Sequence, residues 1–245
     1  MILRYQKAVI FFTLLLFFII PLTTAEESME GKTIICEDGE KYTIQEKIIQ
    51  ASNQPAPKDE IIIVNARKLR LIFYRDGKPF KTYPVSIGEP KTPTPIGEWK
   101  VIHKGGNWGS GFGVRWIGIN VPWGIYGIHG TNKPWTIGQK ASHGCVRLLN
   151  RDVLELYNIV KLGTPVHIIG DLPVCNLRKE LGKNNTGKDV VLLQFALRKA
   201  GFNPGSADGR FGNEMELAVY KFQYYYGLTM TGKITLNEEY LLDLR

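Results

Sequence analysis

The sequence predicts a mainly β domain followed by a small, separate all-α domain. Between residues 59 and 170, short apolar runs alternate with glycine, proline and Asp-Gly turn signals, which is the pattern of short strands. In residues 187–245 apolar residues recur at helical spacing, and a polar linker, residues 171–186, separates the two regions. The chain has 245 residues, 44% of them hydrophobic and 22% charged, so each region can bury an apolar core.

The first 25 residues have the composition of an export signal. Arg4 and Lys7 precede an uncharged apolar run from Ala8 to Leu22, and small residues follow up to Ala25. This run of about fifteen residues is shorter than the roughly 20 that a membrane span needs. We expect residues 1–25 to be a cleaved signal peptide, with a retained N-terminal membrane anchor as the alternative. Residues 26–58 are polar and end in a Pro-Ala-Pro segment, so they are expected to be a linker.

The β domain is expected to begin with a hairpin. Ile61–Val64 forms a short apolar run, and the next run alternates apolar and charged residues up to Phe73. Asp76-Gly77 then supplies the turn, and Phe80–Ile87 returns. The segment Gly88–Gly97 holds three prolines and is predicted to be a loop.

Further strands are predicted at Val114–Val121, Ile125–His129 and Pro165–Ile169. Between the last two, apolar residues adopt a helical period after Asn150, which is the expected N-cap. The domain should therefore contain one or two short helices.

The C-terminal domain is expected to be a three-helix bundle. One apolar stripe runs through Val190, Leu193, Leu197 and Ala200, and Gly201 is positioned to end that helix. Two pairs have the spacing of capping boxes at the starts of later helices, namely Asn213 with Glu216 and Thr235 with Glu238. We expect this bundle to have its own core and the linker to let it act apart from the β domain.

The formal net charge of +8 calls for an anionic partner or surface. Nucleic acid is not expected, because no Lys/Arg cluster is interleaved with aromatic residues and the chain carries an export signal. The three cysteines, Cys36, Cys145 and Cys175, cannot all pair within one molecule, so at least one is free.

The chemistry is expected at Ser142-His143-Gly144-Cys145-Val146-Arg147, together with His129, sixteen residues before the cysteine. A thiolate is the reactive form of cysteine, so a catalytic Cys145 needs a neighbouring base or cation. His129, at the end of a neighbouring strand, is the expected base. His143 lies only two residues from the cysteine and is more suited to orienting than to abstracting the proton.

Two other interpretations of these residues are weaker. Cys145 could be a small buried apolar residue, but two histidines and two glycines lie in a stretch where no packing period demands them. A zinc site would lack a clear fourth ligand, because the remaining candidates are scattered along the sequence: His103, His167, Cys36 and Cys175. We therefore expect neither a metal nor a cofactor.

These residues resemble a known family. The run from Ile128-His129-Gly130 to the Ser-His-Gly-Cys motif is similar to the signature of the L,D-transpeptidases with a YkuD-type catalytic domain, a β-sandwich fold. The upstream segments Tyr83–Gly88 and Thr92–Gly97 also resemble that family. The resemblance covers residues 60–170, and many family members have Asn where this chain has Arg147.

The resemblance implies a mechanism. Cys145 would attack a peptidoglycan stem tetrapeptide at the carbonyl before the terminal D-Ala, with His129 as base and the Gly130 carbonyl orienting the imidazole. Amides near Gly144 and Cys145 would form the oxyanion hole. An amine on a second stem would resolve the thioester into a 3→3 cross-link, and carbapenems would acylate the same thiol. Two further residues are expected to contact substrate, Ser142 and Arg147, although Arg147 could instead be a structural ion-pair partner.

The helical tail resembles one copy of the three-helix peptidoglycan-binding domain, most specifically at Asp208-Gly209-x-Phe211-Gly212. The expected partners are thus stem peptides and wall glycan, at the cell wall or the outer face of the cytoplasmic membrane. Two alternatives stay open. Water could resolve the thioester, giving an L,D-carboxypeptidase, or the chain could be a wall-binding protein with a vestigial site.

Overall fold

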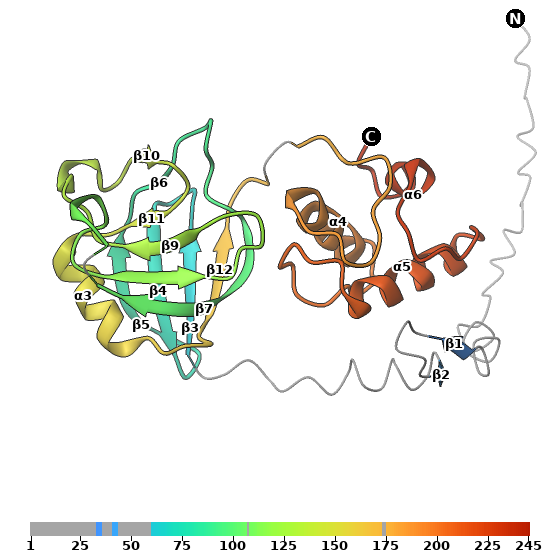
Figure 1. The fold of residues 1–245 in the computed structure, drawn as a ribbon, viewed down its shortest axis with the longest axis horizontal. Helices are drawn as coiled ribbons and strands as arrows, with labels where there is room; N and C mark the ends of the chain where they lie inside the picture. Colours follow the sequence, from blue (N-terminus) through green and yellow to red (C-terminus); the bar gives the residue numbers. More distant parts are fainter. Residues whose placement is uncertain (1–32, 36–40, 44–59, 107, 173–174) are drawn as a thin grey trace, which may run out of the picture. The chain divides into compact units, whose positions relative to one another are not determined.

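The computed structural model describes residues 33–35, 41–43, 60–106, 108–172 and 175–245 (Figure 1). In the N-terminal unit it gives one short antiparallel pair, β1 (Thr33–Ile35) and β2 (Lys41–Thr43). The predicted signal peptide or anchor, most of the predicted linker at residues 26–58, and Cys36 lie outside the described residues. Among the residues that are described, no helix is both long and apolar enough to cross a membrane.

The following unit contains an eight-stranded sheet in the order β11-β9-β8-β7-β12-β3-β4-β5. Its members are β3 (Glu60–Asn65), β4 (Arg70–Arg75), β5 (Lys78–Pro84), β7 (Gly97–Gly105), β8 (Trp116–Ile119), β9 (Tyr126–His129), β11 (Val146–Arg147) and β12 (Pro165–Ile169). Two short parallel strands, β6 (Ile87–Gly88) and β10 (Lys140–Ser142), pair separately. One α-helix, α3 (Asn150–Ile159), follows β11.

The predicted hairpin is confirmed by β4 and β5. Asp76 and Gly77 have φ angles of 51° and 71°, the positive values that a tight two-residue hairpin turn needs. The proline-rich segment after β6 is a loop up to Gly97, as expected. The strand predictions around Val114–Val121 and Ile125–His129 correspond to β8 and β9.

One apolar core joins both halves of the sheet. Ile62 of β3 and Phe73 of β4 belong to the same buried cluster as Ile117 of β8 and Ile128 of β9, so the sheet curls round to enclose them. A register shift between Val101 and His103 marks an irregularity in β7, the strand that pairs with both halves. The expected sandwich is thus formed by a single curled sheet, with α3 packed on it.

Two predicted N-caps are wrong. The N-cap of α3 is Leu149, and Asn150 is the first helical residue; its side chain accepts hydrogen bonds from distant backbone amides instead of capping the helix. The N-cap of α5 (Asn213–Tyr225) is Gly212, with no side-chain cap. The capping box at Thr235 is confirmed, because its amide donates to the Glu238 carboxylate at 2.8 Å.

The predicted three-helix domain is present as α4 (Lys188–Lys199), α5 and α6 (Leu236–Leu241). It has its own apolar cluster, in which Leu193, Leu197 and Phe222 are fully buried and Phe211 is almost so. Ala200 does not belong to this stripe, since α4 ends at Lys199 and Ala200 is exposed.

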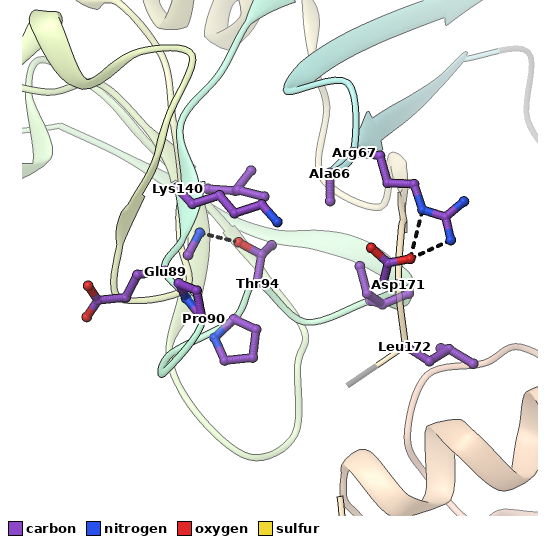
Figure 2. A pocket seen from close by; sticks show the side chains of 12 residues that line it. Ala66, Arg67, Glu89, Pro90, Thr94, Lys140, Asp171 and Leu172 are labelled. Carbon is purple, nitrogen blue, oxygen red and sulfur yellow. Dashed lines mark hydrogen bonds and ion pairs between the residues drawn. The ribbon is translucent and has the colours of Figure 1, made fainter. Parts of the chain in front are cut away.

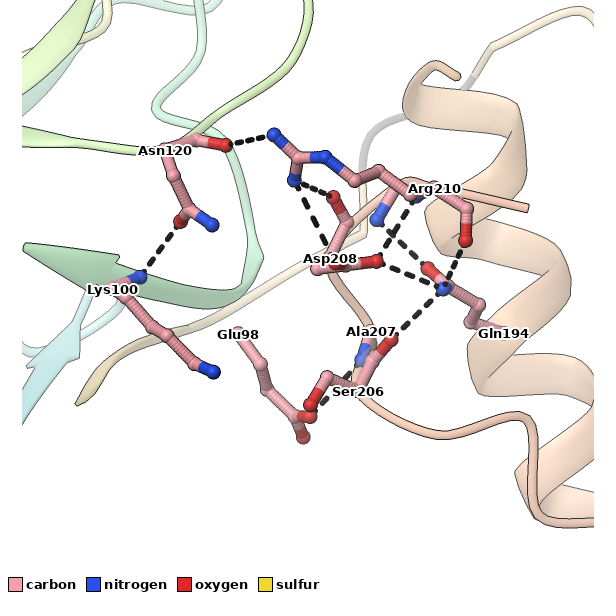
Figure 3. Close-up of polar contacts among 9 residues, drawn as sticks. Glu98, Lys100, Asn120, Gln194, Ser206, Ala207, Asp208 and Arg210 are labelled. Carbon is pink, nitrogen blue, oxygen red and sulfur yellow. Dashed lines mark hydrogen bonds and ion pairs between the residues drawn. The ribbon is translucent and has the colours of Figure 1, made fainter. Parts of the chain in front are cut away.

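The helical domain contacts the curled sheet directly (Figure 3). The Glu98 carboxylate on β7 accepts hydrogen bonds from both terminal nitrogens of Arg198 on α4, at 2.7 and 3.1 Å, and from the Ala207 amide at 3.0 Å. The Glu98 amide donates to the Ala207 carbonyl, and Arg210 donates to the Asn120 carbonyl at 2.8 Å. The two modules are thus in contact in this structure, and the expectation that they act apart stays a prediction.

Candidate active site

Strand register brings the predicted catalytic residues to one face of the sheet. In the parallel pair β9–β11, Val146 lies opposite Ile128 and Arg147 lies opposite His129. Side chains alternate along a strand, so Val146 and Ile128 enter the core while Arg147 and His129 point the other way. Cys145 immediately precedes Val146 and therefore joins Arg147 and His129 on the outer face.

Two glycines leave room for this arrangement. A side chain at Gly127, beside Cys145, would approach the Trp116 ring to 2.7 Å. One at Gly144 would approach the Tyr126 ring to the same distance, and the φ of 115° at Gly144 also disfavours any other residue. Gly144 is thus required by the path of the chain into Cys145.

His129, the predicted base, is a buried and neutral imidazole. Its Nδ1 lies 2.5 Å from the Gly130 carbonyl oxygen, which can only accept, so the proton is on Nδ1 and Nε2 carries the lone pair. Burial lowers the pKa of His129 to about 4; backbone hydrogen bonds to Gly130 and Phe112 oppose this, while the charge of Arg147 adds to it. The ring is stacked on Trp116, with centroids 5.5 Å apart, and meets the Phe112 ring edge-to-face at 5.0 Å.

Cys145 is half-buried and carries a protonated thiol at neutral pH. Burial raises its pKa, whereas a backbone hydrogen bond from Gly127 and the charge of Arg147 lower it without reversing the effect. No hydrogen bond joins the Cys145 sulfur to the His129 ring, both of which belong to the described residues. The resting site therefore holds a thiol and a neutral imidazole on the same face of the sheet, without a hydrogen bond between them.

Ser142 organises the loop that carries Cys145. Its hydroxyl donates to the Cys145 carbonyl at 2.6 Å and accepts from the Gly144 amide at 3.1 Å, and the side chain is buried. The structure thus gives Ser142 a role within the loop, and its expected contact with substrate stays a prediction. His143 is exposed, and within the described part of the chain its ring makes no hydrogen bond, ion pair or ring contact.

Arg147 is a half-buried cation without an acidic partner. Its Nη1 donates to the Ala141 carbonyl at 3.0 Å, while its buried Nε has no hydrogen-bond acceptor. None of the ion pairs between described residues includes Arg147, so the structural ion-pair alternative is not what the structure shows. Ser86 pairs with Arg147 through its backbone, and its buried hydroxyl also lacks a hydrogen-bond partner.

Several residues around the base were not anticipated from the sequence. Trp116 lies opposite His129 on β8, and Trp108 stacks on Trp116 at 5.0 Å and 8°. Phe112 belongs to a short 3-10 turn, Ser110–Phe112, between β7 and β8. The signal that could have found them is the dense glycine and aromatic content of residues 105–116, an unusual composition for a simple connection.

A cavity of about 380 Å³ is lined in part by Lys140, close in sequence to the Cys145 loop, but Cys145 and His129 are not among its lining residues. Lys140 and Thr94 lie on one side of it and the Arg67–Asp171 ion pair on the other (Figure 2). The Thr94 hydroxyl accepts from the Gly88 amide at 2.8 Å, which fixes the loop between β6 and β7. Across the described ranges, no three His, Cys, Asp or Glu side chains are grouped as a metal site.

Comparison with known proteins assigns a family. Residues 59–168 match the family model described as the L,D-transpeptidase catalytic domain. A protein of Bacillus subtilis named "Putative L,D-transpeptidase YqjB" is 36% identical over 132 residues, which cover 48% of this chain and 75% of that protein. The chain belongs to the L,D-transpeptidase family.

Other comparisons show further similarities of this chain to known proteins. Proteins named "Putative L,D-transpeptidase YkuD" from Bacillus licheniformis and Bacillus subtilis are 45% and 41% identical over 107 residues, 44% of this chain. The chain spans only 62% and 63% of their lengths. The solved catalytic domain of an E. faecium L,D-transpeptidase is 27% identical, with a TM-score of 0.41 over 47% of this chain and all of that one.

Residues 186–237 match a second family model, "Putative peptidoglycan binding domain". Both families suggested by the sequence motifs are confirmed.

Proposed function

We propose that this protein forms 3→3 cross-links in peptidoglycan through a thioester on Cys145. The observation that carries the proposal is the register of β9 and β11, which puts the Cys145 thiol and the Gly130-oriented His129 imidazole on one face of the sheet. A thiol nucleophile beside an oriented neutral base is the arrangement that acyl transfer requires.

In the first half-reaction, the Cys145 sulfur attacks the carbonyl carbon before the terminal D-Ala of a stem tetrapeptide. Because the thiol is protonated at rest, His129 Nε2 accepts its proton as the C–S bond forms. The oxyanion faces the Cys145 amide, since the Gly144 amide is already bonded to the Ser142 hydroxyl. The C–N bond then breaks, and D-Ala leaves with the proton from the imidazolium.

In the second half-reaction, the side-chain amine of a diamino acid on another stem attacks the thioester. His129 takes the proton from the amine, the new amide bond forms, and the sulfur leaves as a thiolate that regains the proton. The alternative acceptor, water, would give a shortened stem and make the protein an L,D-carboxypeptidase.

Arg147 is proposed to bind a carboxylate of the stem peptide. Its guanidinium has no acidic partner among the described residues and retains a buried unpaired Nε. The free-energy cost of removing this Nε from water is already met by folding, so it does not oppose the binding of a carboxylate. The helical domain is proposed to retain the enzyme on the wall after export, and carbapenems are proposed to acylate Cys145.

The decisive experiment is incubation with a disaccharide tetrapeptide followed by mass spectrometry. A cross-linked dimer with loss of D-Ala supports the transpeptidase, whereas a tripeptide with added water indicates the carboxypeptidase. Unchanged tetrapeptide, with no adduct after carbapenem treatment, would indicate a wall-binding protein without catalytic function. A pull-down of residues 186–245 with purified sacculi tests the binding role of the tail separately.

A further inference from the structure

Two backbone segments cross beside the catalytic base in a contact that only glycines permit. Gly113 follows the 3-10 turn, and Gly130 follows His129. A Cβ on Gly113 would lie 2.6 Å from the Cα of Gly130, and a Cβ on Gly130 would lie 3.2 Å from the Cα of Gly113. The two segments, far apart in sequence, are therefore in backbone-to-backbone contact.

One side-chain oxygen joins the two segments at this crossing. Asn150 Oδ1 accepts hydrogen bonds from the Val114 amide at 3.3 Å and from the Thr131 amide at 3.1 Å. A Cβ added to either Gly113 or Gly130 would lie 2.2 Å from the same oxygen. The carboxamide thus occupies the space that the two glycines leave open.

Both segments end against the His129 ring. Gly130, next to Thr131, supplies the carbonyl that accepts from Nδ1. Phe112, two residues before Val114, packs its ring edge on the imidazole at 5.0 Å. A change in the separation of the two segments would therefore alter both the orientation of the ring and its access to water.

We propose that Asn150 is a positioning residue for the catalytic base, holding the Phe112 and Gly130 segments together around His129. The proposal deepens the proposed function, because it takes His129 as the base. The charged group that acts on the ring is Arg147 from β11, which lies opposite His129 in the strand pair.

Removal of the Asn150 oxygen should loosen the crossing without damaging the fold. Asn150 is exposed at the start of α3, so Asn150→Ala leaves no cavity in the core. It does leave the Val114 and Thr131 amides without their acceptor, and water is expected to reach the imidazole. The pKa of His129 should then rise from about 4 toward the ordinary 6.5, and the ring should lose its fixed orientation.

The test compares Asn150→Ala, Asn150→Asp and Asn158→Ala in the full chain. Asn150→Asp keeps an acceptor oxygen, and Asn158→Ala is a matched control at an exposed position on the same helix. NMR titration measures the pKa of the His129 ring, whose signals are assigned by their loss in His129→Gln. The rate of carbapenem acylation of Cys145 measures how well the ring acts as a base. Thermal unfolding confirms that each variant is folded.

For Asn150→Ala we expect the His129 titration to move up by at least one pH unit and acylation to slow about 10-fold or more at pH 7. Asn150→Asp should restore most of the rate, and Asn158→Ala should behave as the unmodified chain. An unchanged titration and rate in Asn150→Ala would overturn the proposal while leaving the proposed function intact, provided His129→Gln remains inactive. Normal acylation in His129→Gln would instead remove the base assignment on which both rest.

Discussion

At the scale of single residues, Cys145 and His129 begin the reaction uncharged. Burial raises the pKa of the thiol and lowers that of the imidazole, so a preformed thiolate–imidazolium pair is disfavoured before substrate binds. In the proposed mechanism, proton transfer from the thiol therefore accompanies its attack on the carbonyl. This mode differs from that of a cysteine whose thiolate is already formed at rest.

The pH dependence of acylation should follow from these shifts. His129 has its pKa depressed to about 4, so it stays in its neutral, basic form well below the usual range of histidine. Lowering the pH from 7.5 to 5.5 should therefore change the carbapenem acylation rate by less than about twofold. Stopped-flow measurement of that rate is the check. A tenfold loss over this interval would mean that the base titrates near its ordinary value and that the described burial does not act in solution.

Substitution of the histidines should separate their roles. Cys145→Ala is expected to abolish both cross-linking and drug acylation, because it removes only the sulfur. His129→Ala should slow acylation by at least ~10²-fold, the usual scale for a positioned general base. His143→Ala should have a much smaller effect, since this exposed ring makes no described contact. If His143→Ala were the slower variant, the two histidines would have been assigned in the wrong order.

The sequence pointed to Cys145 and His129 as the candidate pair but not to the residues that surround them. Cys145 and His129 are visible because their chemistry and glycine neighbours form a contiguous motif. Asn150 was predicted as a helix cap on local grounds, yet its oxygen is used by Val114 and Thr131, which come from other parts of the chain. Contacts between residues so far apart in the sequence produce no local spacing pattern from which they could be predicted.

At the scale of elements, the outer face of β8 and β9 depends on small residues. The strands pair Gly118 with Gly127 and Trp116 with His129, so the two glycines leave space beside the large rings. The alternation of apolar residues predicted these strands because every second side chain faces the core. It could not predict the contacts on the outer face, since the residues that pack there come from the turn between β7 and β8.

Gly127→Ala should therefore disturb the site through packing. The added methyl would lie 2.7 Å from both the Trp116 ring and the Ile117 carbonyl, and a carbonyl in a ladder cannot easily move. We expect a loss of roughly 1–3 kcal/mol in the free energy of unfolding, together with slower acylation. Gly111→Ala is the matched control, since nothing lies within 4 Å of its added methyl. Denaturant unfolding of both variants gives the comparison, and equal stabilities would show that the strands can separate to accept the methyl.

At the scale of the whole described unit, the helical domain has its own core and also a specific contact with the sheet. Its core could be predicted from the apolar stripe, but the contact could not, because Glu98, Arg198 and Ala207 lie far apart in the sequence. Burial alone would raise the pKa of Glu98, yet hydrogen bonds from Arg198 and the Ala207 amide hold it below its usual value. The carboxylate is thus stabilised in its charged form at this contact.

Arg198→Met should weaken the docking of the helical domain. The substitution removes two hydrogen bonds to the Glu98 carboxylate and one to the Gly205 carbonyl, while keeping much of the apolar stem. The pair is partly exposed, so screening by solvent limits its contribution to about 1 kcal/mol. Where cleavage follows the population of the undocked form, that difference corresponds to roughly fivefold faster proteolysis within residues 171–186. Lys199→Met, at an exposed neighbouring position, should leave the rate unchanged. Equal cleavage rates in the two variants would mean that the linker opens without undocking, and the two domains would then act separately, as their sequences alone suggest.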